Sequence, residues 1–255
     1  MKRKIVVFGD LPIATKVCMW ISGQSSLELV GCVSSNPMAH NNDPWKDIPM
    51  LRDYCISNNI PLYSYEEFKD DFPKKSLDLG LCCRYNKIIK KDEIDIFRIG
   101  IINMHGGLLP EFAGPYSCNY SVLFNSKKGG GTLHWIDAGI DTGDIIRRCE
   151  FDIENNDTGY TVFQKTQKVL LENMIDIILP ILDGKMTEYI AQKELLDKGY
   201  EHHYFNLKSI EKYKKINISD TQENIVRTVR AFDFPGYEPA YIECGDSKLY
   251  LRTTI

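Results

Sequence analysis

The stretch INMHGGLLPEFAG, residues 102–114, places an asparagine and a histidine two positions apart, just before two glycines. An extended strand alternates its side chains between its two faces, so Asn103 and His105 would point the same way. An asparagine NH2 can donate a hydrogen bond to an oxygen that becomes anionic, and a histidine can accept a proton from an attacking nucleophile. The pair therefore indicates carbonyl chemistry, with Gly106 and Gly107 leaving space for a substrate.

A carboxylate that orients the histidine would complete such a site. The turn-rich segment DAGIDTGDI offers Asp137, Asp141 and Asp144, directly after a predicted strand. His134 on that strand could line the site or pack in the core, and packing is the more common role for such a residue. An Asn and a His beside a glycine turn are also more often a satisfied loop than a catalytic pair, so the pattern alone leaves the choice open.

The elements that must position these residues alternate along the chain. Apolar runs predict strands at residues 4–10, 27–35, 60–64, 77–83 and 100–105. Helical spacing falls between them at residues 11–24, 43–59, 65–72 and 90–97. This alternation predicts an α/β fold with a Rossmann-like, mostly parallel sheet and helices on both faces. Ligands of such sheets gather at the carboxyl ends of the strands, where Asn103 and His105 lie.

The second half of the chain has a different pattern of predicted elements. The expected elements are a helix at 116–128, strands at 129–137 and 143–153, and a long helix at 160–182. Asp157 and Thr158 could cap the long helix, and Pro180 should bend or end it. A polar stretch then leads to a helix at 221–234 and a hairpin at 240–253 that turns at Gly245 and Asp246. We expect a catalytic domain at 1–183 and a C-terminal extension at 184–255 for acceptor binding, dimerisation or both.

Composition narrows the classes of function. The 31 basic residues face 35 acidic ones, giving a net charge of −4, which disfavours a nucleic-acid partner. The eight cysteines form no CxxC pair and His202 and His203 have no third ligand at metal spacing, so no metal site is expected. No apolar run is long enough to cross a membrane or to form a signal peptide. We therefore expect a soluble cytoplasmic protein.

The first turn, FGDLPIATK, does not carry a dinucleotide-binding motif. It offers the single glycine Gly9 where the G-x-G-x-x-G pattern would bring a pyrophosphate to the helix N-terminus. The sheet is therefore not expected to bind NAD in that way.

Together with GGGTLHWIDAGIDTGDII at residues 129–146, the opening stretch resembles the signature of formyltransferases that use 10-formyltetrahydrofolate. That family carries Asn-x-His-(Pro or Gly)-Ser-Leu-Leu-Pro, then a strand with a histidine, then an aspartate in a glycine-rich loop. Asn103, His105 and Asp141 match its catalytic residues, whereas Gly107 stands where serine is usual. The motif match is specific over residues 102–146, and the general pattern of the sequence is similar to the family over residues 1–182.

The resemblance implies direct transfer without a covalent enzyme intermediate. A primary amine attacks the formyl carbon, Asn103 and His105 hold the developing oxyanion, His105 accepts the proton and Asp141 positions His105. The resemblance also implies that the pterin lies against two loops, although a buried strand running into a loop would look the same. The implied contacts are Cys83, Arg84, Tyr85, Ile88, Asp137, Ala138, Gly139, Ile140 and Thr142.

The acceptor is indicated by the C-terminal part of the chain. Residues 216–242 are similar to the segment that follows the catalytic domain in nucleotide-sugar N-formyltransferases, which act on amino deoxysugars attached to UDP or dTDP for surface polysaccharides such as the lipopolysaccharide O-antigen. Expected acceptor contacts are Gly106, Gly107, Pro115, Tyr116, Tyr120, Lys212 and Arg230. Core packing would explain each tyrosine, and a solvated face would explain Lys212, equally well.

Several alternatives stay open at this point. The acceptor could be glycinamide ribonucleotide or methionyl-tRNA, although the latter would call for a further basic domain. A 10-formyltetrahydrofolate hydrolase would resemble this chain but include an additional N-terminal regulatory domain. A catalytically idle nucleotide- or folate-binding protein would not need an intact Asn103, His105 and Asp141. The hairpin at 240–253 has strand edges that need covering, which suggests a homodimer.

Overall fold

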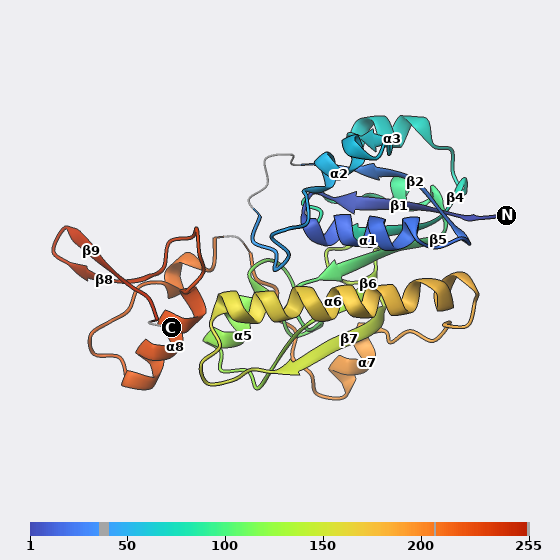
Figure 1. The fold of residues 1–255 in the computed structure, drawn as a ribbon. Coiled ribbons are helices and arrows are strands. Elements are labelled where there is room, and N and C mark those ends of the chain that lie inside the picture. Colours follow the sequence, from blue (N-terminus) through green and yellow to red (C-terminus); the bar gives the residue numbers. More distant parts are fainter. Residues whose placement is uncertain (36–40, 207, 254–255) are drawn as a thin grey trace. The chain divides into compact units, whose positions relative to one another are not determined.

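The computed structural model describes residues 1–35, 41–206 and 208–253, and Figure 1 shows its fold. The strands are β1 (Arg3–Gly9), β2 (Leu27–Val33), β3 (Leu62–Tyr63), β4 (Leu77–Cys83), β5 (Phe97–His105), β6 (Lys128–Trp135), β7 (Ile145–Asp152), β8 (Ala240–Cys244) and β9 (Ser247–Leu251). The helices are α1 (Pro12–Ser22), α2 (Leu51–Ser57), α3 (Tyr65–Asp71), α4 (Lys91–Ile94), α5 (Ser117–Leu123), α6 (Gly159–Leu182), α7 (Gln192–Asp197) and α8 (Gln222–Phe232), with a 3₁₀ turn at Glu211–Tyr213.

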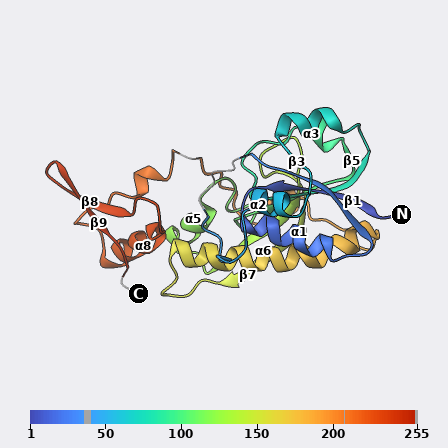
Figure 2. The same cartoon turned by 45° about the horizontal axis from the view of Figure 1, so that its top comes forward.

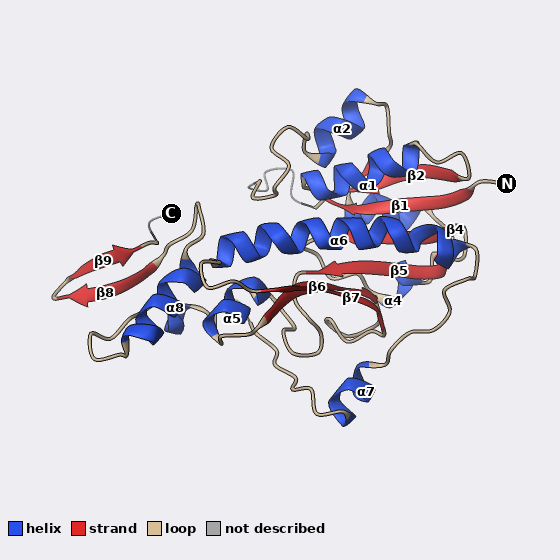
Figure 3. Ribbon diagram, turned by 60° about the horizontal axis from the view of Figure 1, so that its bottom comes forward, coloured by secondary structure: helices blue, strands red, loops and turns tan. Residues whose placement is uncertain are grey.

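The main sheet has seven strands in the order β3-β2-β1-β4-β5-β6-β7. β1 pairs in parallel with both β2 and β4, and β4 pairs in parallel with β5, whereas β5 and β6 are antiparallel. Strands β8 and β9 form a separate antiparallel hairpin that turns at Gly245 and Asp246, as predicted (Figure 3). The predicted α/β fold class is therefore confirmed.

The chain forms two compact units that alternate along the sequence. Unit 1 comprises Met1–His105, Thr132–Arg147 and Leu170–Gln192. Unit 2 comprises Gly106–Gly131, Arg148–Val169 and Lys193–Ile255. The expected division at residue 183, which separates a catalytic domain from an extension by function, stays a prediction.

The core of unit 1 lies on both faces of the parallel strands. Val6 and Phe8 of β1 pack in one buried cluster with Phe68 of α3. Because side chains alternate along a strand, Ile5 and Val7 point to the opposite face. On that face α1 and the C-terminal half of α6 run side by side (Figures 1 and 2). The sheet is thus covered on both sides, as its continuous apolar strands require.

The helix expected at residues 43–59 is mostly loop. Only α2 forms, because Pro44 and Pro49 interrupt the segment before it. Asp43, whose side chain is fully buried, instead caps α1: its Oδ2 accepts the N–H of Ile13 at 2.8 Å. Its Oδ1 pairs with the guanidinium of Arg84 at 2.5 Å.

Asp78 joins β4 to the start of β1. Its carboxylate accepts the backbone N–H of Lys4 at 2.8 Å and lies 3.3–3.4 Å from the guanidiniums of Arg98 and Arg3. Burial by itself raises the pKa of Asp78, but the Lys4 N–H and the two guanidiniums outweigh it and hold the pKa below its usual value. The charged carboxylate is therefore the form that stabilises this junction.

Unit 2 is built around an aromatic core. Tyr120 of α5 stacks on Phe205 with ring centroids 3.7 Å apart, and neither ring is more than 8% exposed. The helix expected at 116–128 ends at Leu123, because the chain turns into β6 at Lys128. Thr158 accepts the N–H of Thr161, which confirms its predicted capping of α6.

α6 continues through Pro180 and ends two residues later, at Leu182. A proline lacks the N–H that a helix interior uses, so its place in the last turn agrees with the expectation that it ends the helix. No helix within the described ranges is both long and apolar enough to cross a membrane.

Candidate active site

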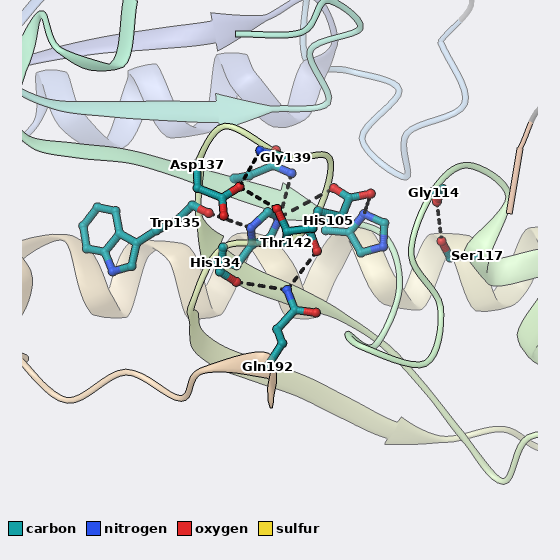
Figure 4. Close-up of polar contacts among 12 residues, drawn as sticks. His105, Gly114, Ser117, His134, Trp135, Asp137, Gly139, Thr142 and Gln192 are labelled. Carbon is teal, nitrogen blue, oxygen red and sulfur yellow. Dashed lines mark hydrogen bonds and ion pairs between the residues drawn. The ribbon is translucent and has the colours of Figure 1, made fainter. Parts of the chain in front are cut away.

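The strand register brings the predicted histidine and asparagine beside a second histidine. In the antiparallel pair of β5 and β6, Asn103 faces His134 and His105 faces Thr132. Directly opposed residues on neighbouring strands project from the same face, so these four side chains form one cluster. The cluster lies in unit 1, at the end of β5 (Figure 4).

Asp141 is the predicted aspartate that meets this cluster. Its Oδ2 lies 3.5 Å from Nδ1 of His105, and its Oδ1 lies 3.7 Å from Nε2 of His134. Both imidazoles are nearly buried, and the carboxylate side chain is 13% exposed. A carboxylate at this distance in a largely dry site favours the imidazolium form of His105 once it accepts a proton. The structure therefore brings together the three residues of the expected catalytic group.

The other two aspartates serve the loop itself. The carboxylate of Asp137 accepts the N–H of Gly139 at 3.0 Å and the hydroxyl of Thr142 at 2.7 Å, which closes a tight turn (Figure 4). The carbonyl of Asp144 accepts the N–H of Trp135 at 3.0 Å. These bonds hold the ends of the loop while Asp141, at φ 55°, occupies the left-handed region in its middle.

Gln192 fixes the backbone of Asp141, a role that sequence reasoning missed. Its amide donates to the carbonyl oxygens of Asp141 at 2.8 Å and Gly143 at 3.0 Å (Figure 4). Gln192 is brought there because Ile190 exchanges two backbone hydrogen bonds with Ile145 at the start of β7. No local pattern signals this contact, since it joins segments about fifty residues apart.

The residues expected at the pterin lie in the loop after β4 and in the aspartate loop, both in unit 1. Ile88 is 65% exposed and Ile140 is 49% exposed, so both loops present apolar surface. The side chain of Cys83 is fully buried, which leaves only its backbone for a ligand. Arg84 adopts φ 56° and its guanidinium is held by the buried Asp43.

Tyr85 lies in the loop after β4 and also packs against the core of unit 1. Its ring contacts the buried ring of Phe8 edge-on, with centroids 5.6 Å apart. Burial raises the pKa of its phenol, and the hydroxyl is buried without a hydrogen-bond partner among the described residues. The hydroxyl is enclosed by the core of unit 1, so a ligand would meet the outer part of Tyr85 and not its hydroxyl.

The residues expected at the acceptor lie in unit 2. A side chain at Gly106 would meet nothing within 4 Å, whereas one at Gly107 would collide with the carbonyl of Phe112 and the side chain of Ser117. Tyr116, which follows Pro115, is 36% exposed and adopts φ 62° at the start of α5.

The other three acceptor candidates are engaged within unit 2. Tyr120 is fully buried, and its hydroxyl bonds Ser209 at 2.8 Å. Lys212 lies over the ring of Tyr213. Arg230 donates to the carbonyl oxygens of Asp157 at 2.7 Å and Glu154 at 2.9 Å, and burial lowers its pKa. These contacts tie α8 to the loop before α6.

Within the described part of the chain, no group of three His, Cys, Asp or Glu side chains is arranged to hold a metal ion. His105 and the carboxylate of Asp141 together provide a base and an anion beside it.

The sequence of the chain matches a protein-family model. A model of the formyl transferase domain matches residues 4–178, which contain β2 to β7, all of β1 except Arg3, and the cluster with Asp141. The chain belongs to the formyl transferase family. The resemblance in its motifs is thereby confirmed, and the cluster occupies the domain that defines the family.

Relatives of this formyl transferase in sequence include the methionyl-tRNA formyltransferase of Clostridium tetani. The two chains are 28% identical over 192 residues, covering 73% of this chain and 60% of that enzyme. In sequence, the chain matches 49–63% of the length of the methionyl-tRNA formyltransferases of Clostridium tetani, Clostridioides difficile and Fusobacterium nucleatum.

Sugar N-formyltransferases are similar to this formyl transferase over almost its whole length. A 4-N formyltransferase from Francisella tularensis has a TM-score of 0.78 at 20% identity, covering 98% of this chain and 97% of its own. WlaRD, a sugar 3N-formyl transferase solved in the presence of dTDP and 5-N-formyl-THF, has a TM-score of 0.76 at 25% identity, with 97% and 85% coverage. The shared fold thus includes the C-terminal part of the chain.

Proposed function

We propose that this protein transfers the formyl group of 10-formyltetrahydrofolate to the primary amine of an amino deoxysugar linked to dTDP or UDP. The observation that carries the proposal is the grouping of Asn103 and His105 on β5 with Asp141 in the loop between β6 and β7, inside the formyl transferase domain. It unites a donor for an oxyanion, a base and an anion that steadies the base.

The positions of the atoms support a role for each residue. His105 presents Nδ1 to Asp141, so Nε2 is the nitrogen that takes the proton of the attacking amine. The carboxylate of Asp141 stabilises the imidazolium that this step creates. Asn103 donates an N–H to the oxygen on which negative charge develops, a contribution worth roughly a hundred- to a thousandfold in turnover. The bond between the formyl carbon and the folate nitrogen then breaks, and His105 gives the proton that it holds to that departing nitrogen.

The loop after β4 and the loop between β6 and β7, both in unit 1, are the proposed pterin site. 10-Formyltetrahydrofolate supplies the formyl carbon that the amine attacks. Ile88 and Ile140 offer exposed apolar faces for a flat ring, and Tyr85 lies in the same loop as Ile88. The backbone of Cys83, Arg84, Asp137, Ala138, Gly139 and Thr142 is proposed to meet the polar edge of the ring. WlaRD was solved with 5-N-formyl-THF, which supports a donor of this chemical class.

The acceptor assignment is supported by the closeness of the structural match. The 4-N formyltransferase and WlaRD superpose on 97–98% of this chain with TM-scores of 0.78 and 0.76, whereas the structure of a methionyl-tRNA formyltransferase that covers 99% of this chain has a TM-score of 0.61. The dTDP in the WlaRD structure points to a nucleotide-linked acceptor. Gly106, Gly107, Pro115, Tyr116, Tyr120, Lys212 and Arg230 stay the proposed acceptor group, with Tyr120 and Arg230 acting through the framework that they hold.

The test is to incubate the protein with 10-formyltetrahydrofolate and a panel of dTDP- and UDP-linked amino sugars, glycinamide ribonucleotide and methionyl-tRNA. Formylated product would be identified by mass spectrometry. We expect formylation of at least one nucleotide sugar. Transfer only to glycinamide ribonucleotide or methionyl-tRNA would refute the acceptor, and no transfer to any amine would refute the function.

Two variants test the residues. His105→Asn and Asp141→Ala should each lose most of the turnover while keeping the far-UV circular dichroism spectrum of the wild type. His203→Asn is the matched control, because His203 is an exposed histidine paired with Glu201 in unit 2. A near-normal rate in either of the first two variants would remove that residue from the chemistry.

We further propose that the protein works as a homodimer in the cytoplasm, in the synthesis of a surface polysaccharide such as the O-antigen. The hairpin of β8 and β9 has only two strands, and Leu249 and Tyr250 on it are more than half exposed. Such edges are usually covered or paired. A monomer in light scattering at micromolar concentration would refute the dimer.

A further inference from the structure

His134 has no part in the mechanism above, yet both of its ring nitrogens are engaged. Its Nδ1 lies 2.8 Å from the carbonyl oxygen of Trp135, and its Nε2 lies 3.0 Å from Nδ2 of Asn103. A carbonyl oxygen can only accept a hydrogen bond, so Nδ1 must carry the proton. The neutral ring then offers an acceptor at Nε2, which matches the NH2 group of Asn103.

The carbonyl that sets this tautomer is itself fixed. The N–H of Trp135 donates to Asp144 at 3.0 Å, and the next N–H, that of Ile136, donates to Ile101 of β5 at 2.8 Å. The loop passes close over the Trp135 carbonyl only because residue 143 is glycine, since a Cβ there would lie 1.9 Å from the oxygen. His134 is 2% exposed, so water hardly reaches this bond.

We propose that His134 is a positioning residue that decides which end of the Asn103 amide serves the reaction, a role that rests on the proposed formyl transfer. One N–H of the NH2 group donates to Nε2 of His134, which leaves the second N–H of the same group for the oxyanion. A reversed amide would present its own oxygen where negative charge develops. A side chain amide has no other intrinsic preference between these two orientations.

A different role for His134 would be as a second base or as the main partner of Asp141. Its Nε2 lies 3.7 Å from Asp141, farther than its 3.0 Å contact with Asn103. With Nδ1 donating to Trp135 and Nε2 accepting from Asn103, neither ring nitrogen is left for a substrate proton. The contacts therefore favour orientation of the amide.

The matched variants are His134→Gln and His134→Asn. A glutamine carbonyl can reach the place of Nε2 and accept from Asn103, whereas an asparagine is long enough only for the Trp135 side. We expect the glutamine variant to keep kcat within about threefold and the asparagine variant to lose about a hundredfold, both with KM nearly unchanged. Adding Asn103→Ala to His134→Asn should cost nothing further, because one interaction has already been lost.

Equal kcat in the glutamine and asparagine variants, or losses that multiply with Asn103→Ala, would overturn the proposal. A further measurement does not depend on the variants folding: the ¹⁵N shifts of His134 in the wild type should show a protonated Nδ1 and an unprotonated Nε2. The opposite tautomer would also overturn it. A wild type that formylates no amine refutes the proposed function, whereas a changed tautomer refutes only the role of His134.

Discussion

Restoring the serine that is usual in the family at position 107 should destabilise this protein. A Cβ at Gly107 would lie 2.4 Å from the carbonyl oxygen of Phe112 and 2.6 Å from the Cβ of Ser117. Real Cβ atoms are essentially never found within 3.0 Å of another heavy atom. The Phe112 oxygen belongs to the backbone, so it cannot move aside as a flexible side chain could. Gly107→Ser therefore forces a shift that costs about 1–3 kcal/mol, as for overpacked cores. For a chain of this size the melting temperature should fall by roughly 2–4 °C per kcal/mol.

Gly106→Ser is the matched control, because a Cβ at Gly106 would meet nothing within 4 Å. Thermal and urea unfolding of both variants, followed by circular dichroism, should show a loss for position 107 and almost none for 106. Combining Gly107→Ser with Ser117→Gly should recover part of the loss, since one of the two collisions disappears. A Gly107→Ser protein as stable as the wild type would show that the steric reasoning is wrong.

Three further variants test the loop and the sheet. Gln192→Ala releases the carbonyl of Asp141 and should lower kcat roughly ten- to hundredfold in steady-state assays; unchanged kcat would show that the loop holds itself. Gly143→Ala places a Cβ against the Trp135 carbonyl and should lower the melting temperature as Gly107→Ser does; equal stability would contradict this. Asp78→Asn removes a carboxylate whose pKa is lowered in the fold, so its stability deficit should be full at pH 7 and shrink as pH falls below about 4; a deficit constant down to pH 3 would refute the linkage.

Much of the fold was predictable because its signals are local. The apolar runs of β1, β4 and β5 and the turn at Gly245 depend on neighbouring residues alone. The helix expected at 43–59 forms only at α2, because Pro44 and Pro49 interrupt the helical spacing before it. The buried role of Asp43 depends on α1 and Arg84, which lie far from it in sequence.

The site was predictable where one motif holds its members close in sequence. Asn103 and His105 share a strand, whereas only the family resemblance, and not spacing, distinguishes Asp141 from Asp137 and Asp144. The pairing of β5 with β6, which turns His134 from a packing residue into a partner of Asn103, is a matter of register. Gln192 depends on a backbone bridge between distant segments, which no periodicity reveals.

The carboxylate of Asp43 lies at the start of α1, the first helix of this α/β fold. The first helix after the first strand of such a sheet commonly offers its initial N–H groups to a ligand phosphate. In this protein the N–H of Ile13 is already bonded to an acid thirty residues downstream, so the chain carries its own substitute for that phosphate. A search that assigned nucleotide binding from strand, turn and helix geometry alone would misjudge this helix. The presence of an internal acid at the helix start would separate the two kinds of protein.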